Sequence, residues 1–80
     1  MRGSLPLRAA KVRKVVKGLT KLGFDLVRTN GSHLVFKHPD GRITVVPRHG
    51  NEEIGTGLLR KIALDIRMAP EEFAEVLESI

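Results

Sequence analysis

The sequence predicts a small α+β domain in the order α-β-β-β-α, followed by a short C-terminal helix. Three observations support this: an amphipathic first segment, two strand-like runs joined by a His-Pro-Asp-Gly turn, and two helical runs after the strands. Because the connections between strands are short, we expect a three-stranded antiparallel sheet with the helices on one face. A chain of 80 residues fits a single domain over residues 1–80, with residues 1–7 as a flexible N-terminus.

The first periodic segment, residues 8–22, is predicted to be an amphipathic helix. Its valines and leucines recur at the i, i+3, i+4 and i+7 spacing of one helix face. Gly23 suits a left-handed helix exit. Basic residues occupy the opposite face with no acidic residue between them, which fits either a solvated face or phosphate contacts. These residues are Arg13, Lys14, Lys17 and Lys21.

Three strand-like runs follow, at residues 24–29, 32–37 and 42–46. Asn30-Gly31 predicts a tight hairpin turn between the first two runs. In the His-Pro-Asp-Gly turn that joins the second run to the third, Pro presets φ and Asp-Gly tolerates positive φ. The three runs therefore predict an antiparallel meander.

The alternation of side chains in the second strand sorts its residues between two faces. Leu34 and Phe36 share one face, which we expect to cover the helices. His33, Val35 and Lys37 share the other. His33 is thus predicted to lie on the less covered side of the sheet, or at its edge.

Two helices are predicted after a polar loop at residues 48–53. Thr56 is a plausible N-cap for a helix over residues 57–67. Pro70 starts the last helix, which ends near Ser79. The apolar face of the first of these helices is predicted to include Ile54, Leu58, Ile62 and Ile66.

Composition limits the functional classes. The formal net charge of +5 favours a polyanionic partner such as nucleic acid. The chain has no cysteine, which fits the cytoplasm, and no apolar run of the roughly 18 residues that a membrane span requires. Phe24 and Phe36 sit in apolar strand patterns, so we expect them in the core rather than on a base-stacking platform.

Neither a general enzyme motif nor a metal-ligand pattern is present, and we expect no cofactor. His33, His38 and His49 have spacings that match no common metal site. His38 and Asp40 are better explained by the turn around Pro39. His33 follows Gly31-Ser32, where glycine permits close backbone approach and serine offers a hydroxyl. Taken alone, a histidine at a strand edge is more often structural than catalytic.

Five short motifs share their order with one known family. They are Leu22-Gly23-Phe24, Gly31-Ser32-His33, His38-Pro39-Asp40-Gly41, Val46-Pro47-Arg48-His49 and Leu59-Arg60-Lys61-Ile62.

From about Val12 to Phe73, the chain resembles the HicA toxin family, the small mRNA interferases of bacterial and archaeal toxin–antitoxin pairs. The resemblance implies a double-stranded-RNA-binding-domain-like fold, an endoribonuclease acting on mRNA, and a HicB-like antitoxin partner. It also implies that the catalytic residue is His33, in the second strand. The chain departs from the family pattern at Gly57-Leu58, where members often have Gly-Thr, and at Arg67, where they usually have glycine.

Further residues are assigned supporting roles. Ser32, Lys37 and His49 are candidates for catalytic support, with Lys37 on the same predicted face as His33. The 2′-OH of RNA supplies the nucleophile, so a histidine acting as general base or acid needs no metal. Cationic side chains are expected to contact the RNA backbone: Lys14, Lys17, Lys21, Lys37, Arg42 and Arg48.

Two other functional classes remain open. One is a noncatalytic module that binds double-stranded RNA by shape and phosphate contacts. The other is a cationic domain that docks an acidic protein partner. A titrating histidine is required only by the ribonuclease.

Overall fold

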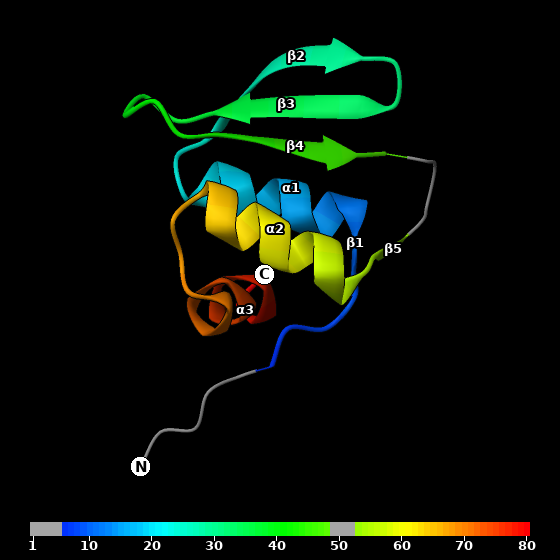
Figure 1. The fold of residues 1–80 in the computed structure, drawn as a ribbon, viewed down its shortest axis with the longest axis vertical. Coiled ribbons are helices and arrows are strands. Elements are labelled where there is room, and N and C mark those ends of the chain that lie inside the picture. The colour runs from blue at the N-terminus through cyan, green and yellow to red at the C-terminus, as the bar shows by residue number, and fades with distance from the viewer. Residues whose placement is uncertain (1–5, 49–52) are drawn as a thin grey trace.

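The computed structural model describes residues 6–48 and 53–80. It confirms the predicted α+β class, with a three-stranded antiparallel sheet and three helices (Figure 1). The predictions for residues 1–5 and for His49 lie outside the described residues. The elements are β1 (Ala10–Lys11), α1 (Val12–Lys21), β2 (Asp25–Asn30), β3 (His33–Lys37), β4 (Ile43–Pro47), β5 (Glu53–Ile54), α2 (Thr56–Asp65) and α3 (Pro70–Glu78).

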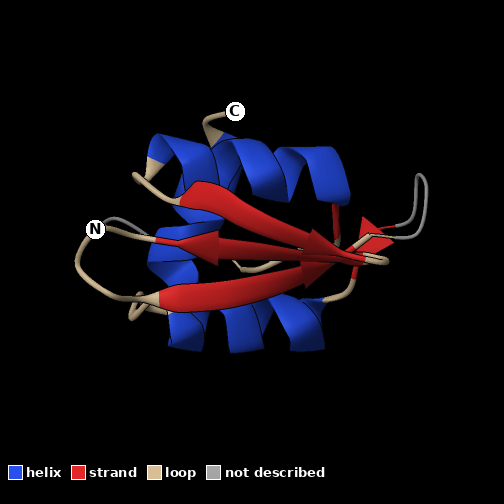
Figure 2. Cartoon of the chain, turned by 90° about the horizontal axis from the view of Figure 1, so that it is seen from above, coloured by secondary structure: helices blue, strands red, loops and turns tan. Residues whose placement is uncertain are grey.

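The sheet has the order β2-β3-β4, and the helices lie on one of its faces (Figure 2). Strand β4 contacts both α1 and α2, whereas β2 is the strand farthest from the helices (Figure 1). All six residues of β2 are exposed. The sheet therefore extends beyond the helix layer along β2.

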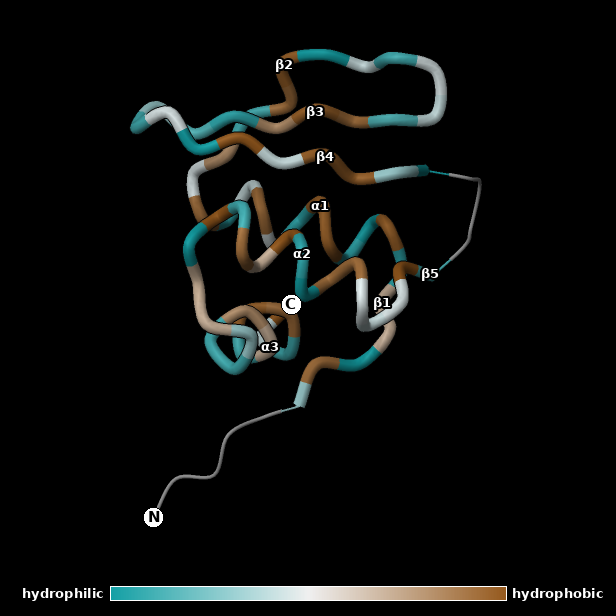
Figure 3. Tube along the Cα trace, viewed as in Figure 1, coloured by the Kyte–Doolittle hydropathy of each residue, from teal (hydrophilic) through white to brown (hydrophobic). Residues whose placement is uncertain are grey.

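The core fills the space between the sheet and the helices. Leu34 and Phe36 are buried and His33 is exposed, as the alternation in β3 predicts. Phe24 is also buried, which confirms that it and Phe36 are core residues. Hydrophobic segments occur in β3, β4 and all three helices (Figure 3). Leu7 packs against this core, although it falls within the N-terminal segment expected to be flexible.

Helix α1 begins at Val12, four residues later than the start predicted at residue 8. Ala10 pairs instead with Ile54, and Lys11 pairs with Glu53, in a two-residue antiparallel bridge. So short a pairing has no side-chain periodicity of its own, and its partner is distant in sequence. The bridge places the starts of α1 and α2 side by side.

Helix α2 corrects two further expectations. Its N-cap is Gly55, whereas Thr56 is already helical. Ile54 belongs to β5, and its place on the apolar face of α2 is taken by Leu59, which is fully buried with Ile62. The prediction of this face was wrong at Ile54, because that residue is buried in the β1–β5 bridge and does not belong to helix α2.

The hairpin between β2 and β3 is displaced by one residue from its predicted position. Asn30 pairs with His33, so the central turn residues are Gly31 and Ser32, and Gly31 has a φ of 60°. A bulge interrupts β2 at Val27, between the pairs Leu26–Phe36 and Arg28–Val35. These pairs place Leu26 on the helix-facing side of the sheet.

Candidate functional site

Four parts of the fold meet at one end of the molecule. The β2–β3 turn, the end of β4 and the N-termini of α1 and α2 all lie on the right in Figure 1. The backbone N–H of Arg48 donates a hydrogen bond to the Ser32 carbonyl, which ties the end of β4 to the turn. The site therefore combines segments that are far apart in sequence.

His33 opens β3 at this end. Its neighbours across the sheet are Asn30 on β2 and Pro47 on β4. Its imidazole is exposed on the face that no helix covers, as the alternation predicts. The position makes His33 accessible to a large substrate.

Lys37 shares the outer face with His33 but lies at the opposite end of β3. It pairs with Asp25 and Ile43, whereas His33 pairs with residues beside the turn. Four residues of strand separate the two Cα atoms by about 13 Å, at a rise of about 3.3 Å per residue. Lys37 therefore does not stand beside the imidazole.

A groove of about 580 Å³ lies on the inner side of β2, next to α1. Its rim is cationic, and no acidic side chain lines it among the residues that the structure describes. Its floor is aliphatic, formed by Val12, Val16, Leu26 and Leu34. The four cations on the rim are Lys11, Arg13, Lys17 and Arg48.

The groove is lined by two of the four cations of α1. Lys17, one of the expected RNA contacts, lines the groove together with Arg13, which had been placed on the same helix face but not among those contacts. Lys14 is half-buried, and the Lys21 ammonium donates a 3.1 Å hydrogen bond to Ser79 Oγ at the end of α3. The four-residue spacing of Arg13 and Lys17 places them on one stripe of the helix, but the same spacing links Lys17 to Lys21, so the sequence alone could not select the pair.

Lys11 had no such signal, because it precedes the helix and its position depends on the β1–β5 bridge. Arg48, in contrast, was an expected RNA contact and lies on the groove rim. Its backbone bond to Ser32 places it near His33.

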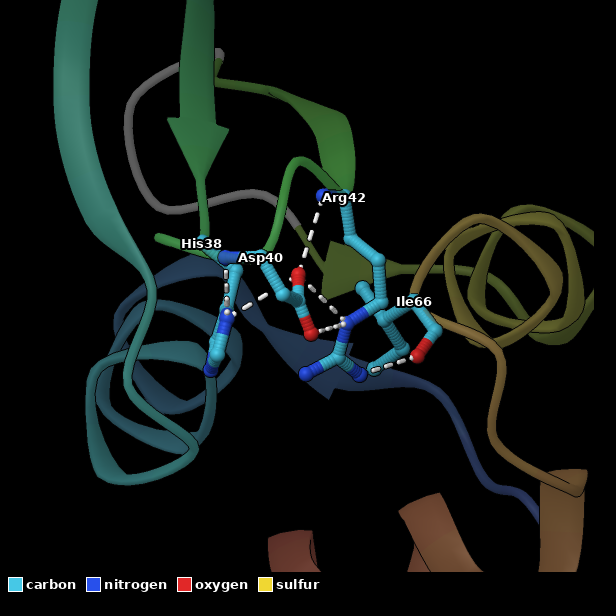
Figure 4. A network of polar contacts seen from close by, with 4 residues as sticks. All are labelled: His38, Asp40, Arg42 and Ile66. Atoms are coloured by element: carbon cyan, nitrogen blue, oxygen red, sulfur yellow. Dashed lines mark hydrogen bonds and ion pairs between the residues drawn. The ribbon is translucent and has the colours of Figure 1, made fainter.

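Arg42, another expected RNA contact, is held inside the fold. Figure 4 shows its guanidinium between Asp40 and Ile66. Nε donates to both Asp40 carboxylate oxygens, at 3.1 and 2.9 Å, and Nη1 donates to the Ile66 carbonyl at 2.6 Å. The guanidinium carbon also lies 5.1 Å from the Phe24 ring centroid. Arg42 thus connects the turn after β3 to the end of α2.

Asp40 is the electrostatic partner in this network. The Arg42 side chain and then the Arg42 backbone N–H donate hydrogen bonds to its carboxylate, and together they lower the pKa of Asp40 to about 2. Hydrogen bonds to the charged form stabilise it against protonation. Asp40 therefore remains an anion well below neutral pH.

His38 belongs to the same network. Its Nδ1 accepts a 3.1 Å hydrogen bond from the Asp40 backbone N–H, and its ring meets the Phe24 ring at a centroid distance of 5.1 Å. The side chain is only 22% exposed. His38 is a turn residue, as expected, but it packs against the core.

At the His33 end, no side chain caps the backbone N–H groups that begin α1 and α2. Neither α1 nor α2 has a side-chain cap or an acidic residue in its first turn. In α3, by contrast, Glu72 Oε1 accepts a hydrogen bond from the Ala69 N–H, and Glu71 adds a second acid. Uncapped N-termini carry partial positive charge, which favours anions.

Within residues 6–48 and 53–80, no three side chains of histidine, aspartate or glutamate gather as metal ligands. In the same residues, no helix has the length and hydrophobicity needed to cross a membrane.

An α-β-β-β-α domain with helices on one sheet face is consistent with the double-stranded-RNA-binding-domain-like class. A family model described as the HicA toxin of bacterial toxin–antitoxin matches residues 12–68, and the chain belongs to this family. The match ends before α3, whereas the sequence motifs predict a resemblance that continues to Phe73. HicA proteins are ribonuclease toxins whose systems include an antitoxin partner. A search of curated proteins finds no significant match.

Proposed function

We propose that this protein is a metal-independent endoribonuclease that cleaves mRNA and uses His33 as its catalytic residue. The observation that supports the proposal most directly is the exposed position of His33 on the uncovered sheet face, at the end where cations and two helix N-termini gather. An mRNA strand is a polyanion that carries its own nucleophile, the 2′-OH.

The chemistry requires three contributions. His33 removes the proton of the 2′-OH, or protonates the leaving 5′-oxygen, and such general acid–base catalysis contributes about 10² to 10⁴ in rate. Arg48 and the N-termini of α1 and α2 offset charge on the phosphate. The second proton transfer falls to His49 or to water, and Ser32 offers a hydroxyl beside the site.

The remaining RNA contacts are sequence-independent. Basic side chains along α1 and on the outer sheet face would bind phosphates whose neutralisation releases counterions. Arg42 is less suited to this role because its guanidinium already bonds Asp40 and Ile66. We assign phosphate contact to Lys14, Lys17, Lys21, Lys37 and Arg48.

The proposed protein partner is a HicB-like antitoxin that silences the nuclease. An acidic surface on such a partner would complement the net charge of +5.

The mechanism is tested by the RNA products. Purified protein is incubated with RNA in EDTA, and the ends are analysed by mass spectrometry. We expect cleavage to persist and to leave a 2′,3′-cyclic phosphate, or its hydrolysed monophosphate, and a 5′-hydroxyl. Products with 5′-phosphates, or activity that requires a divalent cation, would contradict the mechanism.

The role of His33 is tested by His33→Ala. We expect cleavage to fall at least about a hundredfold. Thermal stability should stay nearly unchanged, because an exposed imidazole buries little apolar surface. RNA affinity is measured in parallel by fluorescence anisotropy. A folded variant that binds RNA and cleaves it at the wild-type rate would show that His33 is not catalytic, and absence of cleavage in the wild type would favour a noncatalytic RNA-binding module.

A further inference from the structure

We infer that the groove between α1 and β2 binds the base of an unpaired nucleotide in the RNA strand that is cut, so that the enzyme acts on single-stranded rather than duplex RNA. The inference rests on the proposed function, since it concerns the substrate of the same nuclease. It assigns a role to the aliphatic floor of this groove, which the catalytic chemistry does not use.

The lining of the groove has two chemical parts that match one nucleotide. Its aliphatic floor, which includes Val16, Leu26 and Leu34, suits the apolar face of a base. Its rim carries four cations, which suit the flanking phosphates. At about 580 Å³, the groove has the volume of an ordinary small-molecule site.

Leu26 is the most exposed side chain of the aliphatic floor. It faces the helices from β2, yet it is 51% exposed because β2 extends beyond the helix layer. A base inserted beneath β2 would cover this side chain and remove apolar surface from water.

A duplex could not use the floor in this way. The bases of A-form RNA are stacked and paired, so their faces are hidden, and proteins contact mainly phosphates and 2′-hydroxyls. A site for duplex phosphates needs cations but no aliphatic floor. The combination of floor and rim therefore favours a base that has left its stack.

An arginine on the rim compensates for the lack of an aromatic platform. Guanidinium planes stack on unpaired bases as aromatic rings do. Arg13 lines the groove and has no part in the catalytic step assigned to Arg48, so its guanidinium is the one that would cover the base from above the aliphatic floor.

The register of the sheet connects the groove to His33. Thr29 and Leu34 form a pair that lines the groove, and the next pair towards the turn is Asn30 and His33. Arg48, on the rim, directly follows Pro47, the partner of His33 on β4. A strand leaving the groove at this end would pass the turn and reach the imidazole on the outer face.

The test measures binding without cleavage, using the His33→Ala protein and fluorescence anisotropy. The probes are a short single-stranded RNA, the same RNA annealed to its complement, and single strands that lack one base at successive positions. We expect the single strand to bind about tenfold more tightly than the duplex. Removal of one particular base should cost about tenfold, the scale of one bound base.

Leu26→Ala, made in the His33→Ala background, tests the floor. It should weaken single-strand binding about fivefold, with no change for the duplex, and should reduce the penalty of the missing base. The matched control is Ile43→Ala, a position of similar exposure (49%) on the opposite sheet face, and it should leave binding unchanged.

Equal affinity for single strand and duplex, or equal effects of Leu26→Ala and Ile43→Ala, would overturn the inference. Should Leu26→Ala fail to fold, a series of missing-base probes without any sensitive position would overturn it as well. Cleavage by the wild type is measured separately. A groove without base binding in an active nuclease refutes only this inference, and base binding without cleavage refutes only the proposed function.

Discussion

The Asp40 carboxylate organises the turn between β3 and β4 by accepting hydrogen bonds from Arg42. It bonds the guanidinium and backbone of Arg42, while Arg42 reaches the Ile66 carbonyl across to α2. Charge-assisted bonds of this kind are stronger than neutral ones. The turn between β3 and β4 is therefore fastened to the helix layer, and this fixes the end of the sheet distant from His33.

Acid should weaken the hydrogen bonds by which Asp40 and Arg42 connect this turn to the helix layer. The pKa of Asp40 is lowered from 3.8 to about 2 in the folded protein. A lowered pKa in the folded state means that the ionised carboxylate favours folding above the unfolded value, and that this contribution is lost as pH falls towards 2. We expect the difference in Tm between wild type and Asp40→Asn to narrow between pH 5 and pH 2. Thermal unfolding by circular dichroism measures it, and a difference independent of pH would contradict the assignment.

At the scale of single residues, the sequence could predict which face of the sheet a side chain lies on, but not which side chains already have bonding partners in the fold. The alternation in β3 placed His33 outward and Phe36 inward, because the side-chain period of a strand is fixed by its geometry. It could not predict that Arg42 is occupied, since the Ile66 carbonyl belongs to a distant element. The catalytic role of His33 stays a prediction, which the His33→Ala variant tests.

Helices α1 and α2 end in the same backbone arrangement with different residues. At the end of α1, Gly23 N–H bonds the Thr20 carbonyl and Phe24 N–H bonds the Leu19 carbonyl, both at 3.0 Å. At the end of α2, the N–H groups of residues 67 and 68 make the corresponding bonds. This is the Schellman motif, whose exit residue adopts a positive φ. The exit residues are Gly23, with a φ of 96°, and Arg67, with a φ of 59°.

Arg67→Gly should therefore stabilise the protein. A left-handed conformation costs a residue with a Cβ about 1 kcal/mol, and glycine avoids this cost. We expect the free energy of unfolding to rise by up to about 1 kcal/mol, as measured by urea denaturation. The control is Gly23→Ala, which makes the opposite change at the equivalent exit residue of α1. Its Cβ would also lie 3.0 Å from His38 Nε2, so it should destabilise. A neutral or unfavourable effect of Arg67→Gly would disprove the strain at Arg67.

The positive φ of Arg67 also bears on a departure from the family pattern that the sequence alone does not explain. The resemblance implies glycine where this chain has Arg67, and the positive φ at this position gives the physical reason for such a glycine. The existence and order of the helices and of the three-stranded sheet followed from periodicity and turn residues. The β1–β5 bridge did not, because a pairing of two residues is fixed by the folded chain and not by local pattern.

Across the whole molecule, charge is distributed unevenly. Helix α3 carries four glutamates, at positions 71, 72, 75 and 78, whereas the groove rim is entirely basic. Such an asymmetry orients a polyanion towards the basic end and away from α3. RNA should therefore approach along the groove side of α1.

Salt dependence distinguishes the α1 cations that line the groove from those that do not. Arg13→Gln with Lys17→Gln removes two groove cations, and we expect the slope of log affinity against log salt to flatten by about 1.4 for single-stranded RNA. Lys14→Gln with Lys21→Gln removes the same charge at two positions that do not line the groove, and Lys21 already bonds Ser79. The second pair should flatten the slope less. Equal slopes for the two double variants would place RNA across the whole helix.

The bulge at Val27 has a consequence for the behaviour of many copies of this chain. In the described part of the structure, β2 pairs only with β3, so its other edge presents unpaired backbone groups. A flat strand edge of this kind is a template on which a second copy can add its own strand. The bulge twists β2 and breaks the regular spacing that such growth requires, and Arg28 adds a charge beside it. The irregularity that interrupts the pairing of β2 thus also protects the chain against polymerisation.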